Sequence, residues 1–412
     1  MLDFNASYRK EEETSFGTDI DLTALPAIAG GDADDNRYFN VEARLSSPQG
    51  SAVQWVFGLN HYNERQQQVL ATLAGPGGLD DYSPAPPQRS RARDYAAFGS
   101  VTVPIIDALR LTAGLRYDYA ERELRQAAGV LDLGPVGQFV FAAEDRAGNF
   151  DALLPRASID WKPTENLLLY ASAARGWVPG GFNLAATAVS VSQDFTRFDA
   201  ETLWTYEAGA KLTFLDGRAL LAGAVFHTEA DNWQEFNVLV NEAGQAISTN
   251  LITSNAAIRS RGFELELTAR PDPTLDLAAS FGYVDSVYTD YRFSAVQDFT
   301  GNRVRLVPEF DASVSGSWRP WRGLFLRGEA NGVGNTQLNP DNTAEQGAYL
   351  LLNAQVGWQE DGWDLRLFVD NITDQRVFTT SAYSNFAFGS DGTFYAGVGA
   401  PRVAGVRIGR RW

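Results

Sequence analysis

The stretch LWTYEAGAKL, residues 203–212, decides the fold because its polarity changes at every residue. The polar row is Thr205, Glu207, Gly209 and Lys211, and the apolar row is Trp204, Tyr206, Ala208, Ala210 and Leu212. Successive side chains of a β-strand point to opposite faces, so this stretch has one apolar and one polar face. A helix would need an apolar period of 3.6 residues, which the stretch lacks. The pattern therefore predicts a half-buried strand.

The same alternation recurs along the whole chain. Most segments are about ten residues long, which is the length that a tilted strand needs to cross a bilayer. We predict sixteen strands, at about 2–11, 38–47, 51–62, 95–104, 110–121, 153–162, 167–175, 201–214, 219–230, 259–270, 275–285, 310–319, 324–332, 349–359, 363–372 and 402–412.

The predicted connections alternate in length. Seven are short and rich in Pro, Gly, Asn and Asp, as in Asp216-Gly217 and Pro271-Asp272-Pro273, and these residues favour tight turns. The eight connections between them are long, roughly 16 to 31 residues. Strict alternation predicts antiparallel neighbours with all long loops on one side, as in outer-membrane barrels.

The distribution of charge along the strands bears on the choice between a soluble β-protein and a membrane β-barrel. One row of the strands is almost free of charge, whereas the other carries residues such as Arg116, Glu264 and Asp370. A soluble sandwich or propeller would bury the charge-free row, while a membrane barrel turns it toward lipid. Soluble strands are commonly five or six residues long. Strand length and loop asymmetry favour the membrane barrel, and a soluble β-rich binding protein remains the less favoured alternative.

Composition argues against several classes of function. The 412 residues contain no Cys and two His, His61 and His227, so we predict no disulfide framework, metal centre or cofactor. The formal net charge of -17 argues against nucleic-acid binding. Neither His lies in a nucleophile motif such as G-x-S-x-G, so we do not predict an enzyme. Asp32-Ala33-Asp34-Asp35-Asn36 lacks the Gly and Glu of a calcium loop, and we interpret it as a solvated acidic loop.

The C-terminal residues suggest how the chain reaches its membrane. Counting back in twos from Trp412 gives Arg410 and then an apolar row of Ile408, Val406 and Ala404. A terminal aromatic preceded by alternating apolar residues resembles the signal that the barrel assembly machinery reads in outer-membrane proteins. Arg410 departs from that pattern, although an Arg at the bilayer edge can extend its charge to the interface.

Five motifs, in order, resemble those of the TonB-dependent outer-membrane receptors. LLPRAS…WKP at 153–163 resembles a strand and turn of that family, and residues 168–183, LLYASAARGWVPGGFN, resemble its Y-A-S…R-G-F-x-P-G-G-F-N segment. Residues 204–211 resemble Y-E-x-G-x-K, residues 261–266 resemble R-G-x-E-x-E, and residues 368–374 resemble V-x-N-L-x-D. The motifs cover about 150–412, and the strand pattern covers the whole chain.

The resemblance implies an all-β fold, a transmembrane antiparallel up-and-down β-barrel with about 16 strands of a 22-stranded barrel. Residues 1–412 would be a partial barrel without the family's plug domain or TonB box. The implied function is TonB-dependent uptake of a scarce nutrient, by default an iron–siderophore complex, across the outer membrane of a Gram-negative bacterium. The implied partners are the TonB–ExbB–ExbD system acting through the plug region, the barrel assembly machinery, the lipid bilayer, lipopolysaccharide and the small-molecule ligand.

Aromatic and polar residues near the long loops are the candidate ligand contacts: Arg175, Trp177, Phe182, Asn183, Trp233 and Phe236. Flat rings bury a large area at a small entropy cost. Trp233 and Phe236 fit an interfacial girdle equally well. The arginines at 89, 91, 93, 175 and 197 suit either an anionic ligand or lipopolysaccharide phosphates. A passive sixteen-stranded porin, closed by pairing Leu2–Glu11 with the last strand, is the main alternative.

Overall fold

The computed structural model describes the chain except for residues 20–27, 75–80, 85, 133–137, 184–195, 241–245, 384–393 and 411–412. Among the described residues there is no helix that could cross a membrane. The large sheet contains eighteen strands, and β4 and β17 are short additions to it. The other sixteen are β1 (Leu2–Asp19), β2 (Ile28–Ser46), β3 (Gln54–Ala74), β5 (Gln88–Ile106), β6 (Leu109–Gln126), β9 (Glu144–Thr164), β10 (Leu167–Val178), β13 (Glu201–Phe214), β14 (Ala219–Val240), β15 (Ala246–Asp272), β16 (Leu275–Ser294), β18 (Phe310–Trp318), β19 (Leu324–Val333), β22 (Tyr349–Glu360), β23 (Trp363–Asp370) and β26 (Val403–Arg410).

Short strands lie between the long ones and belong to the long connections. They are β4 (Asp81–Pro84), β7 (Gly129–Asp132), β8 (Gln138–Phe141), β11 (Gly181–Phe182), β12 (Arg197–Phe198), β17 (Gln297–Asp298), β20 (Thr336–Gln337), β21 (Glu345–Gln346), β24 (Phe378–Tyr383) and β25 (Phe394–Val398). Four pairs, β7–β8, β11–β12, β20–β21 and β24–β25, form small antiparallel ribbons.

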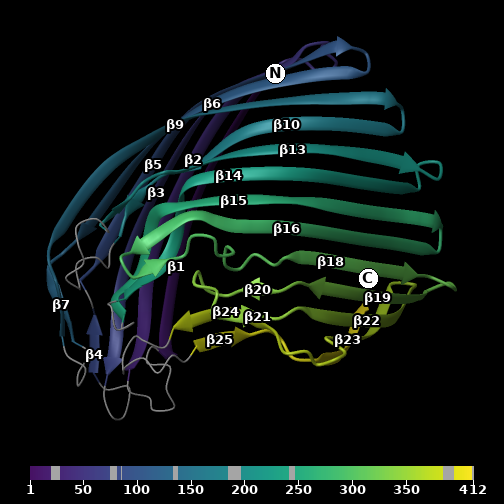
Figure 1. The fold of residues 1–412 in the computed structure, drawn as a ribbon. Helices are drawn as coiled ribbons and strands as arrows, with labels where there is room; N and C mark the ends of the chain where they lie inside the picture. Colours follow the sequence, from purple (N-terminus) through teal and green to yellow (C-terminus); the bar gives the residue numbers. More distant parts are fainter. Residues whose placement is uncertain are drawn as a thin grey trace.

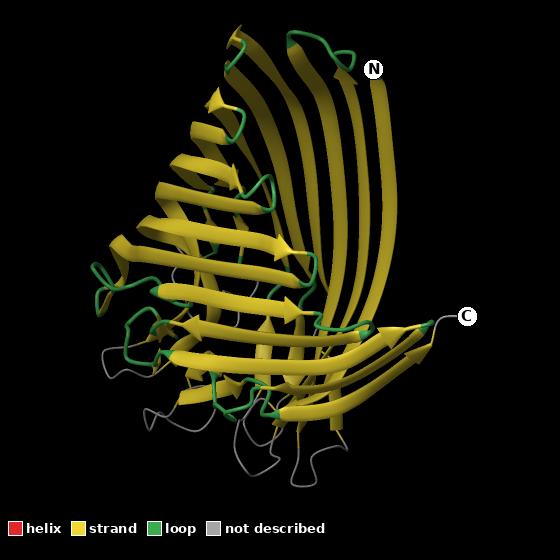
Figure 2. Cartoon of the chain, turned by 90° about the vertical axis from the view of Figure 1, so that its right-hand side faces the viewer, coloured by secondary structure: helices red, strands yellow, loops and turns green. Residues whose placement is uncertain are grey.

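The sixteen long strands follow one another around a single curved antiparallel sheet (Figures 1 and 2). The predicted all-β fold and the number of strands are confirmed. The sheet is not closed within the described residues, because β1 pairs with β2 and β26 pairs with β23. The pairing of Leu2–Glu11 with the last strand, which a closed sixteen-stranded porin would need, is therefore not formed.

Many of the strands up to β16 are longer than the alternation predicted, mainly at one end, whereas β13 has the predicted bounds and β18, β23 and β26 are slightly shorter. β15 has 27 residues, where about twelve were expected, and β3 has 21. The predicted part of each strand adjoins a short turn, and the additional part extends toward the long connections. Only the part inside a bilayer needs one uniformly apolar face. Beyond it the polarity pattern fades, although the ladder of hydrogen bonds continues.

All seven predicted short connections are present at the ends of consecutive long strands. The β13–β14 turn shows why its residues suit it, because Leu215, Asp216 and Gly217 all have positive φ values of 51°, 53° and 82°. Glycine adopts this region without a steric cost and Asp tolerates it better than most residues.

The apolar row faces outward and carries two bands of aromatic side chains. Near the short turns the exposed aromatics are Trp161, Phe214, Trp318, Trp321, Trp358 and Trp363, and toward the long connections they are Tyr8, Phe39, Tyr95, Tyr117, Trp204, Tyr206 and Tyr283. Exposed aliphatic residues such as Leu59, Leu115 and Leu265 lie between the bands. Two aromatic girdles around an apolar band are typical of a barrel wall in lipid.

Candidate ligand-binding wall

A cluster of buried hydrophobic residues lies on the lumen side of β14, β15 and β16, beyond the outer aromatic band. The register pairs Ala230 with Ile258 and Ile258 with Tyr288, on the row that also holds the polar Ser260. Phe299 and Val304, from the connection after β16, fold back onto this row. We call Ala230, Ala256, Ile258, Tyr288, Tyr291, Phe293, Phe299 and Val304 the outer lumen cluster.

A buried carboxylate anchors that connection to the wall. Glu235 is 6% exposed, and its carboxylate accepts a hydrogen bond from Arg305 Nε at 2.7 Å and lies 2.5 Å from Arg305 Nη2. The hydroxyl of Tyr288 donates to the other oxygen at 2.9 Å, and the indole N–H of Trp233 donates to it at 3.4 Å. Every oxygen of this buried charge is therefore paired, as burial requires.

The electrostatics of the site keep the Tyr288 hydroxyl protonated, so that it remains a hydrogen-bond donor. Burial, together with the negative charge of Glu235, raises the pKa of the Tyr288 phenol well above its ordinary value. The hydroxyl stays protonated at physiological pH, so the bond to Glu235 persists.

The Pro179-Gly180-Gly181 run brings a second segment against the wall. A Cβ on Gly180 would lie 2.4 Å from both the Phe150 ring and the Phe198 carbonyl oxygen, so only glycine allows this approach. Asn183, which follows, is buried and bonds the backbone of Ile252 twice, as donor at 2.7 Å and as acceptor at 2.9 Å. The segment is thereby held to β15.

Gln234 ties the same segment to β13 and β14. Its side-chain amide donates to the carbonyl oxygens of Pro179 at 3.0 Å and Asp199 at 3.2 Å. Its backbone N–H donates to the carboxylate of Glu201 at 3.0 Å. Burial raises the pKa of Glu201, and the nearby charge of Glu235 acts in the same direction.

The structure brings some of the predicted ligand contacts together and separates others. Trp233 packs on the outer lumen cluster, and Asn183, which follows β11, is hydrogen-bonded to Ile252 of β15. Phe236 is 53% exposed and its position in the strand next to Glu235 turns it to the opposite face. Arg175 pairs in register with Trp204, on the row that carries the outer girdle.

The remaining two predicted contacts lie over neighbouring strands. The indole N–H of Trp177 donates to the carboxylate of Asp118 on β6 at 3.4 Å. Phe182 pairs in register with Arg197, whose guanidinium stacks over the Phe150 ring at 4.8 Å. The wall thus combines aromatic rings with charged groups in reach of the lumen.

Glu235, Tyr288 and Arg305 were not predicted from the sequence. Glu235 lies between two aromatic residues that were, yet its partner Arg305 is 70 residues away. A lone acidic residue in an aromatic segment is the only local signal, and nothing local identifies the partner.

Two other sequence interpretations can be compared with the structure. Residues 32–36 lie within β2, so they form a strand and not the expected acidic loop. The side chains of His61 and His227 contact the Asp94 carbonyl oxygen at 3.1 Å and the Glu229 carboxylate at 3.2 Å. Among the described residues no group of three or more His, Asp or Glu side chains could hold a metal ion.

The predicted assembly signal falls on β26. Val406 and Ile408 are 67% and 68% exposed, and Ala404 precedes them on the same row. The guanidinium of Arg410 lies 4.8 Å from the Trp363 ring centroid, at the girdle near the short turns. Trp412 lies outside the described residues.

The chain matches a family model and many known proteins. Residues 2–372 match the model described as TonB dependent receptor-like, beta-barrel. The pesticin receptor of Yersinia pestis is 27% identical over 87% of this chain and 48% of its own length. The probable TonB-dependent siderophore receptor PiuA of Acinetobacter baumannii is 26% identical over 72% of this chain and 40% of its own. The chain therefore spans about half the length of the curated relatives it matches.

Solved structures show the same fold. The ferric yersiniabactin uptake receptor FyuA from Yersinia pestis superposes with a TM-score of 0.79 at 20% identity, over 99% of this chain and 58% of that one. PiuA from Acinetobacter baumannii gives a TM-score of 0.73 at 18% identity, over 99% and 62%. At such identities the likeness concerns the fold alone. With the girdles, the antiparallel sheet and the family match over residues 2–372, the chain belongs to the TonB-dependent receptor family of the Gram-negative outer membrane, as its β-barrel.

Proposed function

We propose that this chain is the barrel wall of a receptor that takes up an iron–siderophore complex by TonB-dependent transport. The observation that carries the proposal is the match of residues 2–372 to the receptor barrel, joined to relatives named as siderophore and pesticin receptors. The residues 1–412 would act as one barrel unit around a plug. The wall would bind and orient the ligand, and the proposal includes no chemical reaction on it.

The proposed partners follow from that role. TonB–ExbB–ExbD would supply energy through the plug region, and the barrel assembly machinery would insert the strands, reading Ala404, Val406, Ile408 and Trp412. The bilayer would surround the girdles, and lipopolysaccharide would adjoin the outer one. No nucleic acid takes part.

Of the six predicted contacts we propose Trp177, Phe182, Asn183 and Trp233 as the ligand contacts, and leave out Arg175 and Phe236 because their strand positions turn them away from the lumen. Trp233 is the strongest of these, because its ring adjoins the outer lumen cluster while its N–H reaches Glu235. A partly buried ring with a polar edge can bury an organic ligand and still orient it.

The test is iron uptake by the bacterium that encodes the chain. Cells lacking the gene, grown without free iron, should lose uptake of ⁵⁵Fe supplied with at least one siderophore of a panel. A strain lacking TonB should lose the same uptake, and W233A should raise the concentration needed for half-maximal uptake.

Two results would overturn the proposal. Unchanged uptake of every siderophore in the deletion strain would exclude the ligand class. Flux that is unsaturable and independent of TonB would instead indicate the passive channel.

A further inference from the structure

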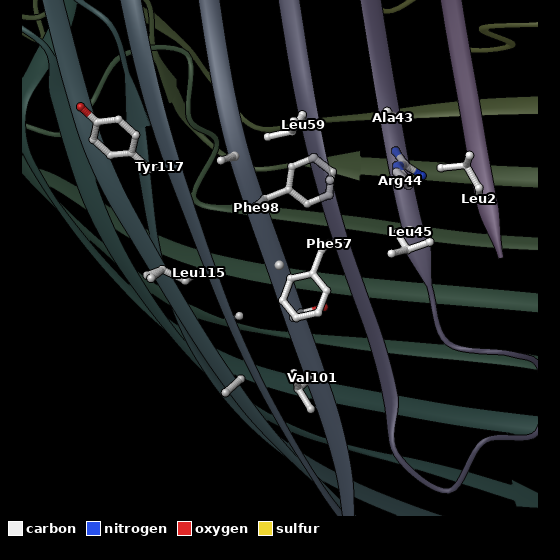
Figure 3. A pocket seen from close by; sticks show the side chains of 16 residues that line it. Leu2, Ala43, Arg44, Leu45, Phe57, Leu59, Phe98, Val101, Leu115 and Tyr117 are labelled. Atoms are coloured by element: carbon white, nitrogen blue, oxygen red, sulfur yellow. The ribbon is translucent and has the colours of Figure 1, made fainter.

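The outward face of β2, β3, β5 and β6 carries three hollows, one above the other. The hollow nearest the short turns has a volume of about 760 Å³ and is lined mainly by apolar side chains, among them Phe57, Leu59 and Leu115 (Figure 3). Ala97 and Gly99 on β5 have almost no side chain, which leaves space between the larger side chains that line the hollow. Because the hollow is apolar and lies on the outward face, it is suited to hold part of an acyl chain.

The second hollow, of about 450 Å³, lies at the outer girdle of the same strands. His61 stacks on Tyr95 with ring centroids 4.6 Å apart, and Tyr119 lies 6.5 Å beyond Tyr95. Flat rings with polar edges, at the height where lipid meets water, suit the sugar ring of a glycolipid.

The third hollow, of about 370 Å³, lies beyond the girdle and is basic. Five arginines line it, against two carboxylates, in a chain whose net charge is -17. The arginines are Arg37, Arg65, Arg89, Arg91 and Arg125. All lie on the odd-numbered row of their strands, which also carries His61 and Tyr95 and therefore faces outward.

The register places like charges directly opposite one another. Arg65 is paired with Arg91 and Arg89 with Arg125, while Glu123 stands opposite Arg91 on its other side. Like charges at opposite positions of an antiparallel pair are destabilising. In the described part of the chain, Arg65, Arg89 and Arg91 have no carboxylate within ion-pair distance, and Arg89 and Arg91 bond only the neutral Gln67 and Asn63. An anion between these strands would relieve the repulsion.

We propose that this face is a binding site for a phosphorylated glycolipid of the outer leaflet. Its acyl chains would lie in the apolar hollow, its sugar at His61 and Tyr95, and its phosphates against Arg65, Arg89 and Arg91. The guanidinium fork matches the geometry of phosphate oxygens. One amphiphile fits the order of the three hollows, whereas a free anion would use only the third. The site depends on the outward orientation of the wall and not on what the lumen transports.

The experiment uses the chain purified from outer membranes and stripped of bound lipid, with native mass spectrometry as the readout. The probes are bis-phosphorylated lipid A, the same lipid without phosphates, and inorganic phosphate as competitor. We expect the dephosphorylated lipid to bind at least tenfold more weakly and inorganic phosphate to compete only at concentrations far above that of the lipid.

The variants separate the site from general attraction to the membrane. The double variant R65Q/R91Q should lose tenfold or more in affinity, and A97F should weaken binding by filling the apolar hollow. R261Q is the matched control, because Arg261 lies on the outward row of β15 and pairs with Asp285; its affinity should not change. R65Q/R91Q also removes a repulsive pair, so it should keep the heat-modifiable gel migration of the folded protein.

The proposal fails if the dephosphorylated lipid binds as well as lipid A, or if R65Q/R91Q and R261Q behave alike. Competition by inorganic phosphate at lipid-like concentrations would contradict it too, since it would indicate an anion site without the lipid. Siderophore uptake is measured separately, so failure here leaves the proposed transport function untouched.

Discussion

Gly180 shows how one residue controls the approach of a whole segment to the wall. Its missing side chain lets the Phe150 ring and the Phe198 carbonyl come within 2.4 Å of where a Cβ would stand. G180A should therefore lower the free energy of unfolding by about 1–3 kcal/mol, the usual cost of overpacking, as measured by urea titration. G347A is the control, because nothing lies within 4 Å of its Cβ position. Equal unfolding midpoints for the two variants would contradict the close approach.

Glu235 is the residue that holds the connection after β16 to the lumen wall. E235Q removes the charge that pairs with Arg305, which is only 24% exposed, so about 1–3 kcal/mol of local stability should be lost. Trypsin added to intact cells should then cut faster after Arg303 and Arg305.

The control for this prediction is R292Q, at the end of β16 where the connection begins. Arg292 pairs with Asp298 on the surface, with side chains 77% and 54% exposed, and exposed pairs contribute little. Cleavage after Arg303 should stay at the wild-type rate in R292Q. Equal rates in wild type and E235Q would show that Glu235 does not anchor the connection.

Glu201 gives the wall a dependence on pH. Burial raises the pKa of its carboxyl in the folded state above the ordinary 4.5, so ionisation costs the folded state more than the unfolded state. The stability should fall as the pH rises from about 4.5 through the raised pKa, and be unaffected by this group below that range. E201Q, which can still accept the N–H of Gln234, should flatten this part of the profile of urea midpoint against pH. A slope that persists in E201Q would assign it to another group.

At the scale of the strands, alternation predicted the number and order of the long elements but not their lengths. The pattern at 259–270 predicts a strand because one face meets lipid, whereas β15 already begins at Ala246, before that pattern starts. The short ribbons, such as Gly181–Phe182 with Arg197–Phe198, were not predicted either. Their pairing depends on contacts between distant residues, which no local period reports.

The outward row of each strand should be intolerant of charge at the level between the two girdles. Leu265 is 47% exposed there, and L265R should lower the unfolding free energy by about 2–4 kcal/mol. E266R places the same side chain one residue later on the lumen row and should cost far less. Urea midpoints in vesicles provide the comparison. Similar losses in the two variants would mean that residue 265 does not face lipid.

For the whole molecule, alternation along the sequence predicted the sheet, whereas the contacts on its lumen side join residues that are far apart in the chain. Trp233 and Asn183 do lie on the wall, but Glu235, Tyr288 and Arg305 meet only because β14, β16 and the following connection converge in space. Arg175 and Phe236 were predicted as ligand contacts because they lie near loops, but their positions along the strands turn their side chains away from the lumen. An odd or even position along a strand tells which face a side chain takes. The bulges between Ala230 and Glu235 shift this alternation, and they are visible only in the pairing of β14 with β15.

The orientation of the whole sheet gives the last prediction. The chain has no Cys, so single cysteines can report which end of the sheet meets the outside. Val296 lies 50% exposed in the connection after β16, and Asp107 is exposed in the short turn between β5 and β6. A membrane-impermeant maleimide added to intact cells should label V296C, while D107C should react only after the outer membrane is permeabilised. Labelling of D107C in intact cells, with V296C protected, would invert the barrel and put the outer lumen cluster on the periplasmic side. Labelling of both in intact cells would mean that the sheet does not span the membrane, and the lipid-facing role of the apolar row would fall with it.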